Sequence, residues 1–247
     1  MRIFIATSDS SSYILKPFAW LMDKYLPEFD EIIILGYGNF PELPPRYRCV
    51  SLVPKQDNIS EWSSRLYDYF TNIDDKYIIF GLDDFFPVRK VDYRVFNPTF
   101  EYMKYNKCVR YELGKGHSWH KKVKRINRSI YEYGQDSLYR ISTQFSVWDR
   151  EYMLKHLYAR ADPFDFELEG SKLAADDGER IIATNTPTAW EWVEAGAISS
   201  RHPGMVNILG MNELDILEMI DLGLFKKELL QYGMDIGDNE KYTLRHG

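Results

Sequence analysis

Residues 76–87 read KYIIFGLDDFFP, an apolar run that leads directly into two acids. The run from 76 to 82 is nearly continuous in apolar side chains, which is typical of a strand buried on both faces of a parallel sheet. Asp83 and Asp84 follow at once, and two phenylalanines and a proline come after them. The sequence therefore predicts a strand that brings carboxylates to the edge of a sheet, with aromatic side chains that wall the space and limit water.

The segments before this stretch alternate between short apolar strands and amphipathic helices. Leu15, Phe18 and Met22, for example, are spaced to share one face of a helix. The predicted strands cover residues 2–6, 31–35, 47–53 and 76–82, and the predicted helices cover residues 12–26 and 59–73. This β-α-β-β-α-β order predicts an α/β fold with a mainly parallel sheet flanked by helices.

The second half of the sequence is less regular. Strands are predicted at residues 107–113 and 180–183, one or two strands within 137–147, and helices at 149–158, 164–175, 212–222 and 224–232. No linker divides the chain, so we expect one compact domain over residues 1–247. Within it we predict a first half with a nucleotide-type sheet (1–110), a substrate-facing second half (111–205) and a C-terminal helical segment (206–247).

Composition and charge narrow the class of protein. The 247 residues are 45% hydrophobic and carry a net charge of −6, which argues against nucleic acid as a partner. Cys49 and Cys108 are too few for a disulfide framework and favour reduced thiols. The N-terminus does not resemble a signal peptide, and no apolar run approaches the roughly 18 residues of a membrane span. We therefore expect a cytoplasmic protein without a transmembrane segment.

Polar side chains follow two of the predicted strands at their carboxyl ends, where open α/β sheets bind ligands. Thr7, Ser8 and Asp9 follow the first strand, and Asp83 and Asp84 follow the fourth. Neighbouring side chains on an extended chain point to opposite faces, so one acid can meet a ligand or metal while the other braces a loop. Carboxylates at this position suit Mg²⁺ or Mn²⁺ holding a diphosphate. The alternative interpretation is a polar turn that ends the strand.

Residues 114–128 form a basic segment without a single acid. One interpretation is a solvated loop. The other is a mobile arm in which Lys115 and its basic neighbours neutralise a phosphate-bearing donor or acceptor, while Trp119 and His120 meet a sugar or base ring. The P-loop, the dinucleotide-binding glycine pattern and the nucleophile elbow of serine hydrolases are all absent from the sequence.

Two further acids lie in the segment PFDFELEGS, residues 163–171. Asp165 and Glu167 stand amid Phe164 and Phe166, and a carboxylate in an apolar pocket has a raised pKa, which suits a general base near neutral pH. The alternative is a helix N-terminus with acids favoured by the helix dipole.

Taken together, these segments resemble GT-A glycosyltransferases. The stretch YIIFGLDDFFP is similar to the "DxD" strand of that family. The run STQFSVWDREYMLKHL, residues 142–157, followed by PFDFELEGS, is similar to a pattern of bacterial and viral sugar transferases of the same fold. The resemblance covers roughly residues 1–200. It implies a nucleotide-sugar donor, usually UDP-linked, and a divalent metal, Mn²⁺ or Mg²⁺, that clamps the diphosphate.

The resemblance also implies roles for individual residues. Thr7, Ser8 and Asp9 would lie near the uridine. Asp83 and Asp84 match the metal motif, although they are adjacent rather than two apart, so that either Leu82 or Phe85 occupies the missing acidic position.

On the catalytic side, Glu167 falls where an inverting member keeps its acceptor-activating base, with Asp165 as the rival. His202 falls where some members supply a late metal or phosphate ligand, and an ordinary surface histidine is the alternative. The implied reaction is a direct displacement, in which Glu167 activates an acceptor hydroxyl on a carbohydrate or another molecule.

Two other function classes stay open at the level of sequence. A nucleotidyltransferase shares the sheet and the metal, but it often carries a basic loop after the first strand, and residues 7–13 contain no basic residue. A GT-A-like domain that only binds sugar or nucleotide is the second alternative. The C-terminal helices could form a cap, a homodimer contact or a membrane-surface patch.

Overall fold

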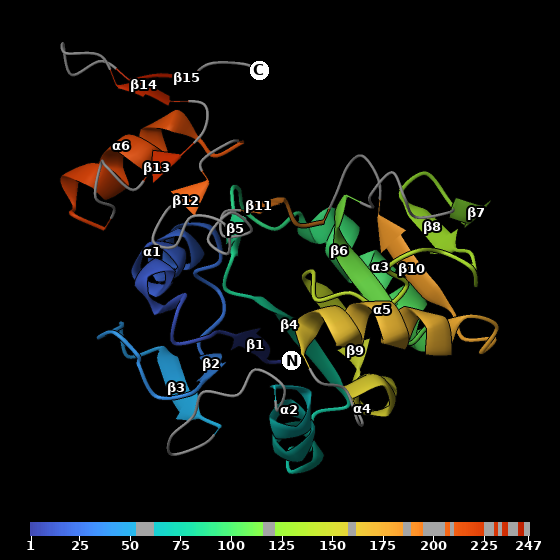
Figure 1. The fold of residues 1–247 in the computed structure, drawn as a ribbon. Coiled ribbons are helices and arrows are strands. Elements are labelled where there is room, and N and C mark those ends of the chain that lie inside the picture. The colour runs from blue at the N-terminus through green and yellow to red at the C-terminus, as the bar shows by residue number, and fades with distance from the viewer. Residues whose placement is uncertain are drawn as a thin grey trace.

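The structure is a computed structural model that describes residues 1–52, 62–115, 122–157, 162–184, 189–194, 206–207, 210–224, 230–231, 234–236 and 242–244. The strands are β1 (Ile3–Ala6), β2 (Ile32–Gly36), β3 (Tyr47–Ser51), β4 (Tyr77–Leu82), β5 (Phe85–Pro87), β6 (Arg110–Lys115), β7 (Lys122–Arg125), β8 (Ile130–Tyr133), β9 (Ser146–Asp149), β10 (Ile181–Thr184), β11 (Trp192–Glu194), β12 (Val206–Asn207), β13 (Leu230–Gln231), β14 (Met234–Ile236) and β15 (Tyr242–Leu244). The helices are η1 (Ser12–Ile14, a 3₁₀ turn), α1 (Leu15–Tyr25), α2 (Trp62–Thr71), α3 (Tyr93–Tyr105), α4 (Arg150–Leu157), α5 (Pro163–Ala174) and α6 (Glu213–Asp221). Figure 1 shows this arrangement.

A nine-stranded sheet forms the centre of the molecule, in the order β3-β2-β1-β4-β9-β6-β10-β8-β7. The first four strands are mutually parallel, and β10 is parallel to β6. β9 runs antiparallel to both of its neighbours, and so does β8. Seven of the nine strands therefore point the same way, which confirms the predicted mainly parallel α/β sheet.

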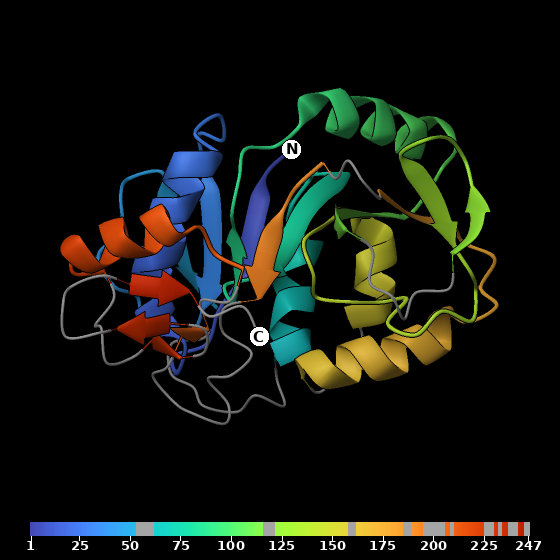
Figure 2. The ribbon, with the colours of Figure 1, turned by 90° about the horizontal axis from the view of Figure 1, so that it is seen from above.

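The side chains of β1 explain why helices cover both faces of this sheet. Ile3 and Ile5 point into one hydrophobic core, which includes apolar residues of α1, α3 and α6. Phe4 and Ala6 point into a second core, which includes apolar residues of α2, α4 and α5. Figure 2 shows α3 and α5 on opposite sides of the sheet. Because successive side chains of a strand point to opposite faces of the sheet, both faces are apolar, and each face is buried by its own set of helices.

Helix α3 was not predicted. It begins after Asp92, whose carboxylate accepts a hydrogen bond from the backbone N–H of Arg94 at 3.0 Å. Pro98 lies inside the helix, and a proline lacks the N–H of the helical ladder, so it normally indicates a helix end. The helix persists because Phe96 and Met103 are buried in the first core.

Two other predictions were wrong in part. Residues 137–145 form an irregular loop, and only β9 follows it, because side-chain hydrogen bonds to this loop replace the ladder of a strand. The helix predicted at 212–222 is confirmed as α6, but residues 230–231, assigned to a second helix, form β13 and pair with β12. The proposed halves 1–110, 111–205 and 206–247 stay a prediction, and the main sheet runs through the first two.

Helix α6 is fixed to α1 by a polar contact. The carboxylate of Asp215, which is 2% exposed, accepts a hydrogen bond from the Tyr25 hydroxyl at 2.5 Å and pairs with Lys24 at 2.8 Å. Within the part of the chain that the structure describes, none of the helices has the length and apolar character to cross a membrane.

A buried charge pair lies at the centre of the sheet. Arg110 on β6 and Glu112 two residues later have fully buried side chains 3.5 Å apart. The guanidinium also donates to the Ser146 hydroxyl at 3.0 Å and to the Arg140 carbonyl at 2.9 Å. Burial lowers the pKa of Arg110, and the charge of Glu112 acts in the opposite direction.

Removal of one partner of this pair leaves the other charge buried and uncompensated. We expect Glu112→Leu to lower the free energy of unfolding by about 3–5 kcal/mol. The double variant Arg110→Met/Glu112→Leu should lose less than Glu112→Leu alone, because it removes both buried charges. Urea denaturation of the wild type, Glu112→Leu and the double variant measures these free energies of unfolding. A double variant that is the least stable of the three proteins would contradict the interpretation.

Candidate functional site

The carboxyl ends of β1 and β4 meet at the point where the sheet changes its winding direction. Ala6 and Leu82 are paired in register, so the next residues, Thr7 and Asp83, lie side by side. The hydroxyl of Thr7 donates to Asp83 Oδ2 at 2.5 Å, and the hydroxyl of Ser11 donates to the same oxygen at 2.8 Å. Asp83 is therefore the acid of the pair that braces a loop, at the position where open α/β sheets bind ligands.

The braced loop, residues 7–12, presents a row of hydroxyl groups. The backbone N–H of Ser8 donates to the Ser11 hydroxyl at 3.1 Å, and the two hydroxyls lie 2.9 Å apart. The carboxylate of Asp9 accepts the backbone N–H of Asn39 at 3.1 Å, and the Asn39 amide donates to the Ser12 hydroxyl at 3.2 Å. These bonds connect the loop after β1 to the loop after β2. The sequence-predicted residues Thr7, Ser8 and Asp9 thus lie together at one edge of the sheet.

The environment of Asp83 changes its acidity. Burial raises the pKa of Asp83 to about 6, and the hydrogen bonds from Thr7 and Ser11 offset part of this effect. The side chain is 5% exposed. Near neutral pH its carboxylate is still mainly ionised, so a negative charge lies in a nearly dry position beneath the hydroxyl loop.

Asp84 and the two phenylalanines have different environments. Asp84 is half-buried in the turn between β4 and β5, so the acid pair forms a turn and also contributes a buried carboxylate. Phe86 is fully buried in the first core, 6.3 Å from the ring of Phe18. Phe85 packs against Trp192 with ring centroids 4.5 Å apart. Of the two rings, Phe85 therefore contributes to the wall beside the turn.

The carboxylates do not form a metal site by themselves. Among the described residues, no group of three His, Cys, Asp or Glu side chains is placed to hold a metal ion. Asp83 already uses one oxygen for two hydroxyls. Mg²⁺ sites commonly use one or two carboxylates and complete their coordination with substrate phosphates. A shared metal site at Asp84 stays a prediction, and His202 lies outside the described residues.

Glu167 lies on α5 and contacts the loop before β9. Its Oε1 accepts two hydrogen bonds from Thr143, one from the backbone N–H at 2.7 Å and one from the hydroxyl at 2.8 Å. Because β9 runs antiparallel to β4 and β6, the start of β9 lies at the carboxyl edge of both neighbours. Glu167 is therefore held at the same edge of the sheet as the hydroxyl loop.

The predicted apolar pocket around Asp165 and Glu167 is wrong in one respect. Asp162 caps α5 and accepts the backbone N–H of Asp165 at 2.8 Å, so the acids do decorate a helix N-terminus. Phe166 is fully buried, but Phe164 is 72% exposed. Side chains that are two residues apart on a helix point to nearly opposite sides, so these two phenylalanines cannot enclose one site.

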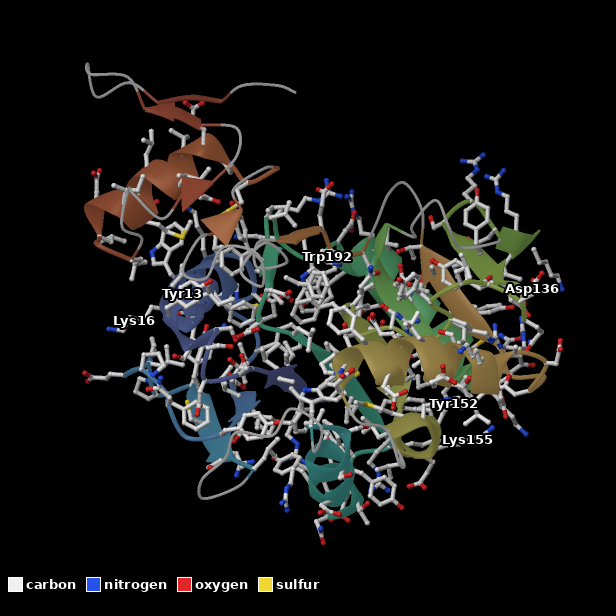
Figure 3. The ribbon with its side chains drawn as sticks, viewed as in Figure 1. Tyr13, Lys16, Asp136, Tyr152, Lys155 and Trp192 are labelled. Atoms are coloured by element: carbon white, nitrogen blue, oxygen red, sulfur yellow. The ribbon has the colours of Figure 1, made fainter. Side chains whose placement is uncertain are left out.

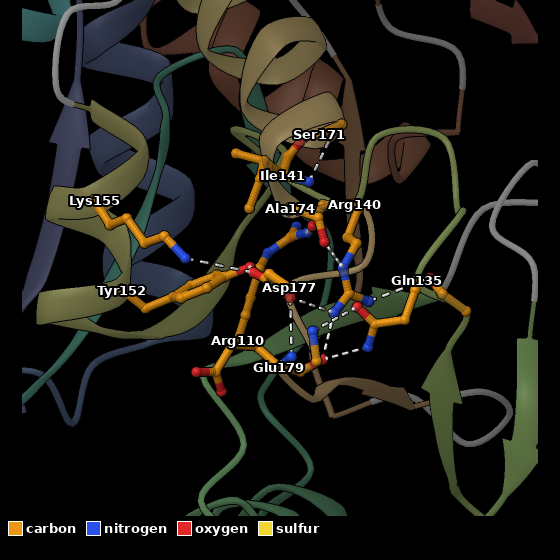
Figure 4. Close-up of polar contacts among 12 residues, drawn as sticks. Arg110, Gln135, Arg140, Ile141, Tyr152, Lys155, Ser171, Ala174, Asp177 and Glu179 are labelled. Carbon is orange, nitrogen blue, oxygen red and sulfur yellow. Dashed lines mark hydrogen bonds and ion pairs between the residues drawn. The ribbon is translucent and has the colours of Figure 1, made fainter.

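The loop of residues 134–145 is anchored along α5 by Arg140, a residue that sequence reasoning missed. Its buried guanidinium donates to the carbonyls of Ala174 at 3.1 Å and Gly134 at 3.2 Å. One turn earlier on α5, the Ser171 hydroxyl accepts the N–H of Ile141 at 3.0 Å and donates to the Ile141 carbonyl at 3.2 Å. Figure 4 shows these contacts. They fix the path that ends at Thr143.

A second group of contacts extends this anchor toward α4. Arg140 also binds the Glu179 carbonyl and lies 3.5 Å from Asp177. Asp177 accepts the Tyr152 hydroxyl at 2.8 Å, and Lys155 lies 3.9 Å from the same carboxylate (Figure 4). Asp177 therefore acts in a structural contact that connects α4 to the Arg140 loop.

Three predicted binding residues cannot be placed. The backbone of Lys115 ends β6, and its side chain lies outside the described part of the structure, as do Trp119 and His120.

Comparisons with known proteins show the fold. No protein-family model matches the chain, and no curated protein matches it. UDP-glucose pyrophosphorylase complexed with UDP-glucose aligns with a TM-score of 0.51 at 9% identity, over 80% of this chain and 94% of that chain. S. aureus TarS 1-349 aligns with a TM-score of 0.47 at 10% identity, over 77% of this chain and 59% of that chain. S. aureus TarS 1-349 in complex with UDP-GlcNAc aligns with a TM-score of 0.46 at 11% identity, over 77% of this chain and 57% of that chain. The chain thus spans less than two thirds of the TarS chains, and the likeness to the pyrophosphorylase is one of fold alone.

Asp83 predicts a pH dependence of stability. The folded protein binds a proton at Asp83 below about pH 6, whereas the unfolded chain does so near 3.8. The folded state therefore holds more protons between these values, and this group raises the free energy of unfolding as the pH falls from 7 to 4. We expect Asp83→Asn to abolish this contribution and to stabilise the protein at pH 7.5 by about 3 kcal/mol.

Urea denaturation at pH 7.5 and pH 5 in EDTA buffer measures this effect. Asp74→Asn is the matched control, because Asp74 is exposed at the opposite end of β4. An Asp83→Asn protein with the same change in stability between the two pH values as wild type would refute the prediction.

Proposed function

We propose that this protein is a glycosyltransferase that takes a sugar from a UDP-linked donor and transfers it to an acceptor hydroxyl. The observation that carries the proposal is the hydroxyl loop braced by buried Asp83 at the carboxyl ends of β1 and β4. The fold likeness to UDP-glucose pyrophosphorylase, a protein whose structure holds UDP-glucose, supports a nucleotide sugar as the ligand. The resemblance of the sequence to GT-A glycosyltransferases supports sugar transfer.

The donor binds along the edge formed by β1 and β4. Thr7, Ser8 and Asp9 offer hydroxyl and carboxylate groups to the uridine, and Asp84 is the residue that would hold Mn²⁺ or Mg²⁺ beside the diphosphate. When bound, the metal supplies positive charge that stabilises the leaving diphosphate. Lys115 and the basic segment that follows are the predicted source of further positive charge, and Trp119 and His120 stay predicted contacts of the donor.

Glu167 activates the acceptor. Both hydrogen bonds from Thr143 go to Oε1, so Oε2 is the oxygen that would take the proton of an acceptor hydroxyl. The acceptor oxygen forms a bond to the anomeric carbon as its proton moves to Glu167. The bond between that carbon and the diphosphate oxygen breaks on the opposite side, and the nucleotide leaves with the electron pair. One such displacement inverts the anomeric centre. Asp165, two residues nearer the start of α5, is the rival base.

A nucleotidyltransferase is the second candidate function, because the structure with the higher TM-score quoted above is a pyrophosphorylase. Such an enzyme must hold the triphosphate of a nucleotide, which favours basic residues in the loop after the first strand. Residues 7–12 contain none. A domain that binds the nucleotide sugar without reacting is the third candidate.

Binding of UDP tests the donor site. We expect calorimetric titration to show UDP binding that Mn²⁺ strengthens, and we expect Asp84→Asn to weaken the Mn²⁺-dependent binding by about tenfold or more, the loss of one charge-assisted contact. Asp74→Asn is again the matched control and should bind UDP like wild type. Absence of UDP binding with and without Mn²⁺ would refute the proposal. Binding that is the same in Asp84→Asn would remove Asp84 from the site.

Replacement of Glu167 separates binding from transfer. We expect Glu167→Gln to keep the affinity for UDP and to lower the hydrolysis of UDP-glucose and UDP-GlcNAc by roughly 10²–10⁴-fold, the range for loss of a general base. Glu169→Gln is the matched control, since Glu169 lies on the same helix and pairs with Lys172 at the surface. Synthesis of a UDP-sugar from UTP and a sugar phosphate, without donor hydrolysis, would favour the nucleotidyltransferase.

A further inference from the structure

Helix α5 carries two exposed apolar side chains beside the proposed base. Phe164 is 72% exposed, and Leu168 is 49% exposed. Side chains three or four residues apart on a helix are neighbours, with Cβ atoms about 5–6 Å apart. Phe164 therefore lies next to Leu168, four residues later, and next to Glu167, three residues later. Contiguous apolar surface that stays in water often marks a binding site.

The packing of α5 determines which of its side chains face outward. Phe166 is fully buried, and its ring lies 5.8 Å from that of Trp62. Gly170, one turn later, lies so close to the loop before β9 that an added Cβ atom would be 3.1 Å from Ile141 Cγ2. Each residue advances by about 100° around a helix, so Phe164 is turned by about 200° from Phe166. The exposure of Phe164 is thus imposed by the core contacts of the same helix.

The two ends of α5 have different neighbours. Tyr152 and Lys155 of α4 lie beside the later part of the helix, where both contact the third residue after its end (Figure 3). Near its start, the helix contacts Trp62, and the ring of Trp62 lies 6.5 Å from that of Phe80 on β4. Phe164, in the first turn, therefore lies toward β4, whose carboxyl end belongs to the proposed donor edge.

The charge around Phe164 restricts what can bind there. Lys172 is the single basic residue of α5, and it stands against four acids in the helix and its cap: Asp162, Asp165, Glu167 and Glu169. This negative potential repels phosphorylated and other anionic groups. A neutral molecule with hydroxyl groups can instead donate hydrogen bonds to carboxylates. Neutral saccharides combine such hydroxyl groups with an apolar face.

We propose that Phe164, with Leu168 beside it, binds the apolar face of a neutral saccharide acceptor and holds one of its hydroxyl groups at Glu167. The proposal rests on the proposed function, in which Glu167 takes the proton of that hydroxyl. One face of a pyranose presents C–H groups that are weakly positive, and the face of a phenyl ring is electron-rich. The separation of one helical turn, about 5–6 Å between Cβ atoms, is comparable to the width of a pyranose ring.

Binding of saccharides to the UDP-loaded protein tests the proposal. Methyl β-glucoside, lactose and chitobiose are titrated in saturating UDP and Mg²⁺ and followed by ligand-observed NMR. We expect at least one of them to bind, and we expect Phe164→Ala to weaken its affinity about tenfold, with UDP affinity like wild type. Phe164→Tyr keeps a ring and should retain most of the affinity. Leu168→Ala should cause a smaller loss.

Tyr105→Ala is the matched control, because Tyr105 is an aromatic residue that is 88% exposed on α3, on the other side of the sheet. This variant should bind the saccharides like wild type. Thermal melting of each variant verifies the fold, and we expect little change for Phe164→Ala because the side chain it removes is exposed.

Three results would overturn the saccharide site while UDP still binds. The first is equal saccharide affinity in wild type and Phe164→Ala, and the second is no binding of any of the three saccharides to the UDP-loaded wild type. The third is sedimentation of the wild type with phosphatidylglycerol vesicles that Phe164→Ala abolishes, because it would make the exposed pair a membrane contact. Failure of the wild type to bind UDP would refute the proposed function and the acceptor site with it.

Discussion

β1 lies between β2 and β4, and this placement determines where a ligand site can form. The chain leaves β1 through α1 toward β2 on one side, and it returns through α2 to β4 on the other, so the two helices cover opposite faces. The two crossovers diverge at the carboxyl ends of β1 and β4, which is where open α/β sheets bind ligands. The alternating apolar side chains of β1 satisfy both faces at once. The polar residues that follow β1 and β4 meet at this edge as a consequence of the strand order.

The buried carboxylate of Asp83 lowers the stability of the fold near neutral pH. Its burial raises its pKa to about 6, so near neutral pH the fold carries an unfavourable buried charge. Two hydroxyl donors offset part of that cost, and in return the hydroxyl loop is held in one conformation before any ligand arrives. A fixed array of polar groups loses less conformational entropy on binding. Stability and preorganisation are therefore opposed at this residue.

In the second half of the molecule, two buried arginines hold the irregular loop between β8 and β9. Arg110 connects β6 to the loop before β9, and Arg140 connects that loop to α5 and to the turn before β10. These guanidiniums satisfy backbone carbonyls that a strand would have paired in a ladder. The loop then delivers Thr143 to Glu167 with both of its donors aligned. Placement of the proposed base thus depends on charges that never contact a ligand.

The sequence by itself determined the order of elements up to β4 and the polar residues at the ends of β1 and β4, because hydrophobic periodicity is a local property of the chain. It failed at α3, where Pro98 signals a helix end that packing of the helix overrides. Only the tertiary structure decided which acid braces the loop, since Thr7 and Asp83 are 76 residues apart. The same holds for Thr143 with Glu167 and for Trp192 over Gly114. Such contacts exist only after the strands have paired, and local patterns carry no information about which distant residues that pairing brings together.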